Sequence, residues 1–147
     1  MDSNRLPRAS RLRRRQLIRP LFDRGREDVA STAHGCIRLV YRVVPRTEQG
    51  IEAPVQVGFS PGRGHKRAVD RNRIKRRMRE VYRVNQSVLA EHFRESDRAL
   101  TLMVLFRGSL EQAASCIARD LPIALEKASR QLRQLSTDRQ IHTQSTG

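Results

Sequence analysis

The chain has 147 residues, a length typical of one domain, and 37% of them are hydrophobic, which excludes a wholly disordered basic tail. Thirty lysines and arginines stand against 15 acidic residues, so the formal net charge is +15. Self-repulsion on this scale favours a polyanionic partner, and we expect nucleic acid rather than a membrane because no lipid-seeking amphipathic helix is recognisable. The longest apolar run, residues 99–106, is too short to cross a bilayer. We therefore expect a soluble cytoplasmic protein.

The two cysteines, Cys36 and Cys116, stand far apart in the sequence. Their separation matches neither a short metal-ligand motif nor a disulfide framework. We therefore expect two small buried thiols and no metal site on the protein.

The amino-terminal part of the chain predicts one helix. Residues 1–10 are polar and basic, and we expect them to be unordered. From Arg11 onward, apolar side chains fall at helical spacing as far as Gly25, which is a plausible stop. Pro20 lies inside this segment, so it either begins a short helix or kinks a longer one.

Two strands are predicted next. Residues 36–44 alternate as a strand does, with Arg38 and Arg42 on the face opposite Tyr41. Residues 45–54, which read PRTEQGIEAP, are typical of a turn or a long hairpin loop. Residues 55–60 then give the second strand.

The helix predicted from Ala68 to about Ala90 has the clearest periodicity in the sequence. Its apolar residues, which include Ile74 and Met78, gather on one side, and arginines occupy the opposite side. We therefore expect Ile74 and Met78 to fasten this helix to a sheet.

The last predicted elements are a strand and a helix. Residues 99–106 are apolar throughout, which indicates a strand buried on both faces. Ser109 is a possible cap for an alanine- and leucine-rich helix that reaches about Leu135, with an interruption or kink at Pro122. Residues 136–147 are expected to form a loose tail.

These elements predict an α+β protein, built as a two-layer α/β sandwich in the order αββαβα, with room for one further short strand. The domain is expected at residues 11–135, between tails at 1–10 and 136–147. A strand–helix–strand unit with parallel strands is right-handed by default.

The basic residues are concentrated in two segments. Residues 63–83 contain ten lysines and arginines and two acids, whereas a solvated helix face usually mixes both signs. Guanidinium groups make planar bidentate contacts with phosphate, and helical spacing distributes them over successive phosphates. Residues 5–26 contain nine further arginines. Two separate basic surfaces indicate an extended or folded RNA rather than one groove of a duplex.

One feature of the long basic helix leaves two roles open, and another argues against one class of DNA-binding protein. Asn72, near the expected helix start, is able either to cap that end or to bond a base edge or a ribose. No heptad zipper follows the helix, which argues against a bZIP-like protein.

No pattern typical of a catalytic site is present in the sequence. The four histidines are scattered and the acidic residues do not pair at metal-binding spacing. If the protein takes part in catalysis, we expect its partner to supply the reactive groups.

The stretch from VGFS through RAVDRNRIKRRMREVYR resembles the protein component of bacterial ribonuclease P, whose signature is a run of the form RNxxKRxxRE. The matching residues are Arg71, Asn72, Arg73, Lys75, Arg76, Arg79 and Glu80. The LFxxG pattern of the first predicted helix, made by Leu21, Phe22 and Gly25, matches as well.

The resemblance implies an α/β sandwich in which the strand–helix–strand crossover is left-handed, in place of the right-handed default. It implies partnership with a large catalytic RNA and with precursor tRNA, whose 5′ leader is removed by phosphodiester hydrolysis. The RNA and its Mg²⁺ ions perform the chemistry, so no catalytic residue of the protein and no protein-held metal are expected. No further protein partner and no membrane are expected either.

The resemblance also assigns residues. RNA contacts are expected from the basic helix and the residues before it: Lys66, Arg67, Arg71, Asn72, Arg73, Lys75, Arg76 and Arg79. The single-stranded leader is expected in a cleft between the first helix and the sheet, with contacts from Phe22, Ile18, Tyr41 and Ser60. Tyr41 is also in phase with Leu39, so a position in the core is an open alternative.

Two other functions remain as hypotheses. A ribosomal or RNA-chaperone protein would use a similar basic sandwich only for binding. An autonomous nuclease is disfavoured, because the sequence offers no cluster of carboxylates to hold catalytic metal ions.

Overall fold

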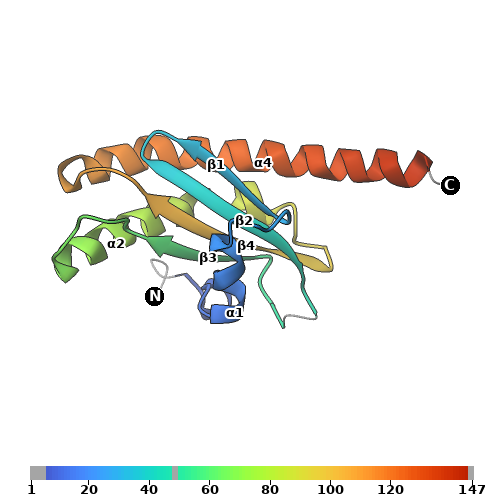
Figure 1. Ribbon diagram of the computed structural model, residues 1–147, viewed down its shortest axis with the longest axis horizontal. Helices are drawn as coiled ribbons and strands as arrows, with labels where there is room; N and C mark the ends of the chain where they lie inside the picture. The colour runs from blue at the N-terminus through green and yellow to red at the C-terminus, as the bar shows by residue number, and fades with distance from the viewer. Residues whose placement is uncertain (1–5, 48–49, 146–147) are drawn as a thin grey trace.

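A four-stranded mixed sheet and two long helices form the body of the protein (Figure 1). This computed structural model describes residues 6–47 and 50–145, with side chains described through residue 135. In chain order the elements are η1 (Arg8–Ser10), α1 (Arg15–Ile18), η2 (Arg19–Phe22), β1 (Val29–His34), β2 (Ile37–Pro45), β3 (Val55–Ser60), α2 (Ala68–Asn85), α3 (Ser87–Ala90), β4 (Arg98–Phe106), η3 (Leu110–Gln112) and α4 (Ala113–Ser145). In the described part of the chain, no helix has the length and apolar character needed to cross a membrane.

The strand order in the sheet is β1-β2-β4-β3. Strand β2 runs antiparallel to both of its neighbours, and β3 runs parallel to β4. The expected α+β class is confirmed, and β1 is the further short strand. The expected hairpin between β2 and β3 is wrong, because β4 lies between them. A central position suits β4, the strand whose side chains are apolar on both faces.

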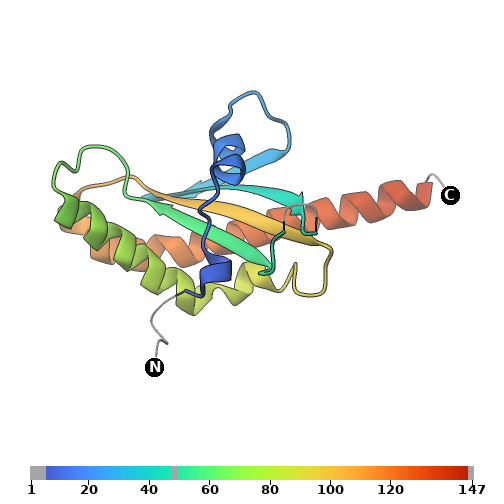
Figure 2. The same cartoon turned by 90° about the horizontal axis from the view of Figure 1, so that it is seen from below.

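Strand β4 separates two hydrophobic clusters. Leu102 and Val104 face the larger cluster, which α2 and α4 cover, whereas Met103 faces a smaller one that contains Leu17 and Leu21. Figure 2 shows this arrangement, with α1 on one side of the sheet and the two long helices on the other. The protein therefore has the two expected layers, and a short helical segment covers part of the free face of the sheet.

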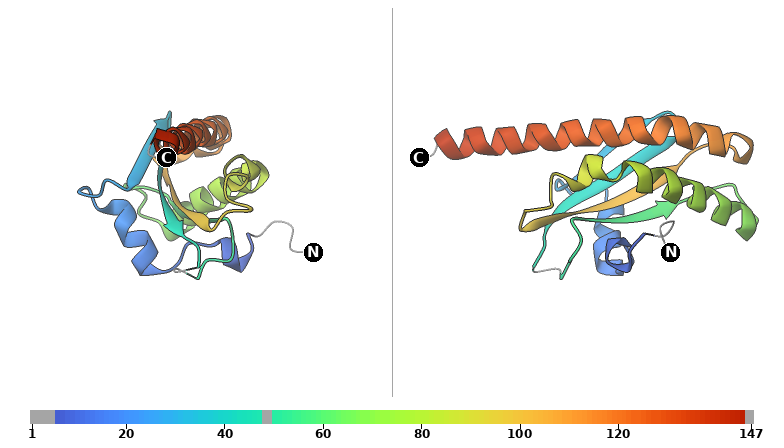
Figure 3. Two further views of the ribbon diagram at one scale, coloured as in Figure 1. Left: turned by 90° about the vertical axis from the view of Figure 1, so that its right-hand side faces the viewer. Right: turned by 180° about the vertical axis from the view of Figure 1, so that it is seen from behind.

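The connection from β3 through α2 to β4 joins two parallel neighbours. In the right-hand panel of Figure 3, both strands run to the right, α2 lies in front of the sheet, and β4 lies above β3. A crossover with the helix in front that moves to the left of the strand direction is left-handed. This geometry departs from the usual rule for such units.

Helix α2 begins at Ala68, as predicted, but it ends earlier than expected. The side-chain amide of Asn85 donates from Nδ2 to the carbonyl oxygen of Val81 over 2.8 Å. A turn at Gln86 then separates α2 from α3. Gln86 keeps helical backbone angles, and Leu89, in α3, is fully buried. The apolar periodicity continues across the break, which explains why the sequence predicted one helix.

The amino-terminal segment also differs from its prediction. Pro20 ends the regular α-helix after one turn, and the chain continues as the 3₁₀ segment η2. Leu6 is buried in the larger cluster, and the Leu12 amide donates to the Val57 carbonyl over 3.0 Å. Residues 6–10, which were expected to be unordered, therefore include a core residue and belong to the folded domain. Of the expected tail at 1–10, residues 1–5 lie outside the described part.

Helix α4 is longer and more regular than predicted. It runs through Pro122 without ending, and its backbone remains helical to Ser145, so the expected loose tail from residue 136 is wrong for residues 136–145. After Pro122 the sequence contains no glycine or proline until Gly147, so nothing in it stops the helix. Ser109 is not a side-chain cap of this helix; it precedes η3 and makes no capping hydrogen bond.

The tight turn between β1 and β2 is attached to α4 by a buried carboxylate. Gly35 occupies the left-handed region at φ 54°, and the amide of Cys36 donates to Oδ2 of Asp120 over 3.0 Å. The Arg119 guanidinium and the Cys36 amide both lower the pKa of the Asp120 carboxyl, so it is ionised at neutral pH. A Cβ atom on Gly35 would overlap this carboxylate.

Gly35→Ala is therefore expected to destabilise the fold by about 2 to 5 kcal/mol, the sum of a left-handed backbone penalty and overpacking against Asp120. Gly50→Ala is the matched control, because Gly50 also has positive φ, 62°, but a Cβ atom there would meet no described residue within 4 Å apart from its chain neighbours. Its expected cost is about 1 kcal/mol. Urea unfolding measures both, and equal costs would show that Asp120 does not clamp the turn.

Candidate nucleic-acid interface

The buried apolar residues of α2 determine in which direction its lysines and arginines point. Ile74, Met78 and Tyr82 are buried against the sheet, so the residues between them point sideways or outward. The prediction that Ile74 and Met78 fasten the helix is confirmed. Because the helix is held rigidly, its guanidinium groups are presented at fixed helical spacing.

On the β3 side of α2, Lys75 and Arg79 line a cavity of about 430 Å³ together with Arg11 and Arg13. The Arg79 guanidinium lies 6.0 Å from the centre of the Phe59 ring, a cation–π contact. This cavity therefore joins cations from the two basic segments of the sequence, which lie on opposite sides of β3 in chain order.

On the α4 side, Arg73, Arg76 and Arg77 line a second cavity of about 370 Å³ along the two helices. Arg76 is 79% exposed, and its Nε lies 3.5 Å from a carboxylate oxygen of Glu80. Arg77 donates to the Ala114 carbonyl over 3.3 Å, which ties it to α4. Arg73 and Arg76 are thus exposed towards solvent, whereas Arg77 has a structural contact.

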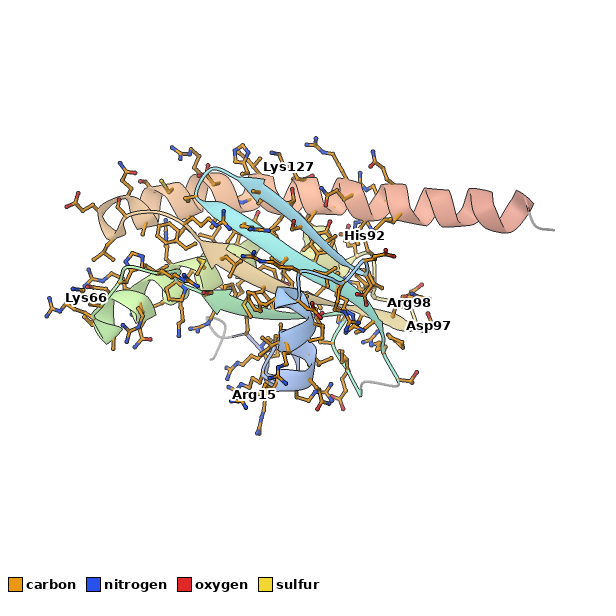
Figure 4. The ribbon with its side chains drawn as sticks, in the orientation of Figure 1. Arg15, Lys66, His92, Asp97, Arg98 and Lys127 are labelled. Carbon is orange, nitrogen blue, oxygen red and sulfur yellow. The ribbon has the colours of Figure 1, made fainter. Side chains whose placement is uncertain are left out.

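The start of α2 contains the other expected RNA contacts. Lys66, Arg67 and Asn72 are exposed, and Figure 4 shows Lys66 at the far end of the molecule from Arg98. Arg71 donates from Nη1 to the carbonyls of His65 and Lys66, each over 2.8 Å. The capping alternative for Asn72 is wrong, because the cap position is Arg67 and Asn72 lies inside the helix.

A larger cleft of about 970 Å³ lies on the face of the sheet that α2 and α4 leave free. Phe22, which is 52% exposed, and Ser60 both line it. Its charged lining is strongly one-sided, with Asp23 as its acid and five arginines: Arg24, Arg26, Arg38, Arg63 and Arg107. The cleft thus combines an exposed ring with an excess of positive charge.

An acidic residue beside the cleft pairs with one cleft arginine, Arg26, and with Arg42, which does not line the cleft. Asp28 accepts from Arg26 over 2.9 Å and from Arg42 over 2.7 Å. The bonds from Arg26 and Arg42 hold the pKa of the Asp28 carboxyl well below its usual range, and Asp28 raises the pKa of Arg26. Arg26 is therefore oriented by its partner, and the acid that lines the cleft, Asp23, faces an excess of positive charge from the remaining cleft arginines.

Two expected leader contacts lie outside this cleft. Tyr41 is a core residue on the opposite face of the sheet, where its hydroxyl bonds to the side chain of Gln131 in α4 and burial raises its pKa to about 12. The core alternative for Tyr41 is correct, because side chains alternate along β2 and its apolar neighbours define the helix-covered face. Ile18 is half-buried and packs against the smaller core cluster.

The sequence interpretation missed Arg38 and Arg107 as cleft residues. Arg38 and Tyr41 both belong to β2, and their side chains point to different faces of the sheet. The alternation of side chains along this strand therefore predicts that Arg38 lines the cleft, once the face that the helices leave free is known. Arg107 follows the end of β4, and only the strand order brings it to the cleft.

The comparisons with known proteins decide the family. The family model described as Ribonuclease P matches residues 6–135. The chain belongs to the ribonuclease P protein family. A ribonuclease P protein component from Chlorobaculum tepidum is 33% identical over 118 residues, which cover 77% of this chain and 74% of that protein. The match begins at Leu6, which is also a buried core residue.

The fold agrees with the family. The solved structure of the Staphylococcus aureus RNase P protein matches with a TM-score of 0.50 and 21% sequence identity. The match covers 78% of this chain and 94% of that one. It supports the shared α+β architecture.

Of the described residues that line the large cleft, Asp23 is the carboxylate that could bind Mg²⁺, and one carboxylate does not make a ligand set. Mg²⁺ prefers carboxylate and other oxygen ligands, and five arginines surround the acid of the large cleft. Among the described residues, the group of three potential metal ligands is Cys36, Cys116 and Asp120, and none of them lines the cleft.

Arg76→Ala is expected to weaken binding to the RNA and to lower the slope of log K against log salt by about 0.7 to 0.9, the value for one lost phosphate contact. Thermal stability should be unchanged, because Arg76 is exposed. Arg71→Ala should lower stability as well, since it removes the two bonds to the loop.

Arg98→Ala is the matched control for both, because Arg98 is an exposed arginine at the other end of the molecule (Figure 4). Filter binding over a salt series and thermal unfolding measure the effects. A slope unchanged by Arg76→Ala would show that Arg76 makes no phosphate contact.

Proposed function

We propose that this chain is the protein subunit of a ribonuclease P holoenzyme, which removes the 5′ leader of precursor tRNA and so takes part in tRNA 5′ maturation. Membership of the family supports this proposal. The observation that carries the finer assignment is the cleft in which Phe22 and five arginines surround one concave surface.

The basic helix α2 is the proposed contact with the catalytic RNA. Arginine suits this role because its planar guanidinium pairs with phosphate in a bidentate manner. Arg73 and Arg76 project from one flank of α2, and Lys75 and Arg79 project from the other. A ladder with two flanks fits a folded RNA, whose phosphates lie on more than one surface.

The large cleft is the proposed site for the single-stranded leader. An exposed aromatic ring stacks on unpaired bases of any type, and a positively charged groove follows the backbone. Phe22 supplies the ring, and the arginines on β2 and beyond β3 and β4 supply the charge. Ser60 contributes a hydroxyl at the cleft wall. Tyr41 lies in the core and is not part of the proposed leader site.

The protein's contribution to the reaction is binding and orientation. Mg²⁺, held mainly by the RNA, would supply the metal-bound water and stabilise the leaving oxygen. Neutralising phosphates near the cleavage site reduces the charge that metal ions must otherwise offset. A protein subunit of this kind is therefore expected to matter most when Mg²⁺ is scarce. A cytoplasmic location and independence from other proteins remain predictions.

The proposed function is tested by adding the purified protein to a bacterial ribonuclease P RNA at low Mg²⁺ and following 5′ cleavage of precursor tRNA. We expect restored cleavage at the mature 5′ end. A ribosomal protein or an RNA chaperone would bind RNA without restoring site-specific cleavage, and that outcome would reject the proposal. Cleavage by the protein without the RNA would instead indicate an autonomous nuclease.

Phe22→Ala tests the leader site. If Phe22 stacks on a base, affinity for leader-bearing precursor should fall by about 1 to 3 kcal/mol, and affinity for mature tRNA should not change. Leu135→Ala is the matched control, because Leu135 is also an apolar residue that is 50% exposed, and it lies on α4 outside the cleft. Equal losses for precursor and mature tRNA would place the effect of Phe22 in folding.

A further inference from the structure

The turn between β1 and β2 brings together donor atoms that are distant in the sequence. The Sγ atoms of Cys36 and Cys116 and a carboxylate oxygen of Asp120 all lie within 4.8 Å of one another. Nε2 of His34 lies 3.8 Å from Oδ1 of Asp120. Cys36 follows the glycine turn, and Cys116 and Asp120 lie one helical turn apart on α4, so three potential ligands converge from two parts of the chain. His34, on the other side of the turn, approaches the carboxylate of this group.

We propose that Cys36, Cys116 and Asp120, with His34 as the fourth donor, bind one Zn²⁺ ion that clamps the β1–β2 turn to α4. Two thiolates, an imidazole and a carboxylate are ligands that suit Zn²⁺ and do not suit Mg²⁺ or Ca²⁺. A tetrahedral zinc site needs donors about 3.3 to 3.8 Å apart, given bond lengths of about 2.0 to 2.3 Å. The Cys36, Cys116 and Asp120 donors, which lie within 4.8 Å of one another, would have to move closer together to reach this range, and the imidazole of His34 would have to turn towards the two sulfurs.

The surroundings of the cluster resemble the outer shell of a metal site. The Cys36 amide donates to Asp120 Oδ2 over 3.0 Å and fixes the carboxylate. The Cys36 carbonyl accepts from the Arg107 amide over 2.7 Å, so the ligand is anchored on both sides. Groups that orient ligands in this way are typical of metal sites.

A side-chain cation already occupies part of the site. Arg119 donates to both carboxylate oxygens of Asp120, over 2.8 and 3.1 Å, and its Nη2 lies 3.6 Å from the Cys116 sulfur. The Arg119 side chain is 66% exposed, so it is free to move to solvent. A metal ion would replace this guanidinium as the positive partner of the carboxylate.

The location connects the site to the cleft. Arg107 and Gly108, which follow β4, line the cleft and adjoin Cys36. A bound ion would therefore hold the β1–β2 turn, the end of β4 and the start of α4 as one unit. This would stiffen one end of the proposed leader site, but the site itself is independent of the RNA-binding proposal.

Cobalt(II) is the probe, because it occupies zinc sites and its thiolate and tetrahedral complexes absorb light. The full chain, free of RNA and with its thiols kept reduced, is titrated with Co²⁺. We expect a thiolate-to-cobalt charge-transfer band that saturates at one equivalent and is abolished by Zn²⁺. Zn²⁺ should also raise the thermal unfolding midpoint, since it binds the folded state. Absence of the band would overturn the proposal.

Variants identify the ligands. Cys116→Ser should remove most of the charge-transfer intensity, and His34→Ala, at a half-exposed residue, should weaken Co²⁺ binding about tenfold or more. Arg119→Gln should strengthen binding, because it removes the competing cation. His92→Ala is the control histidine, since His92 bonds to Ser129 farther along α4.

Circular dichroism before titration establishes that each variant is folded. Equal Co²⁺ binding by the wild type, Cys116→Ser and His34→Ala would overturn the assignment, as would loss of binding in His92→Ala alone. These readouts do not depend on cleavage of tRNA, so failure of the metal site and failure of the proposed function are distinguishable.

Discussion

Strand β4 is the element on which the other parts of the structure depend. Its alternate side chains face two separate hydrophobic clusters, so it is buried from both sides. One cluster secures α2 and α4, and the other secures the short helical segment that ends at Phe22. The basic helix and the cleft are therefore attached to opposite faces of one rigid strand, and their relative positions are determined by side-chain packing rather than by flexible loops.

Charge is the opposing constraint. The chain has a net charge of +15, and the cleft holds five arginines around one acid. Asp28 and Glu80 each pair with two arginines and so relieve this repulsion locally. Most of these acids and their partners are exposed to solvent, where an ion pair contributes little to the free energy of unfolding. The free protein thus retains electrostatic strain that a polyanion removes. The same feature that weakens the isolated fold strengthens RNA binding, and both effects diminish as salt increases.

Strand β3 connects the two basic surfaces. Gly58 lines the cavity beside α2, where a side chain would meet Met103, and Ser60 lines the large cleft. The amino-terminal segment lies along the same strand through the bond from Leu12 to Val57 and contributes Arg11 and Arg13. Cations from two distant segments of the sequence thereby flank a single strand, which is the physical basis for treating the proposed RNA and leader contacts as parts of one interface.

The sequence by itself determined the local features. Periodicity identified α2 and its buried Ile74 and Met78, an uninterrupted apolar run identified the doubly buried β4, and the basic run of α2 resembled the signature of the family. These features depend on neighbours within a few residues, so a single sequence reveals them. Only the tertiary structure decided what depends on pairing between distant segments. The packing of α2 and α4 against one face of the sheet decided that Tyr41 is covered and that Arg38 lies on the free face, and the docking of α4 brought Cys116 beside Cys36. Spacing along the chain carries no information about such contacts, because they follow from how whole elements pack.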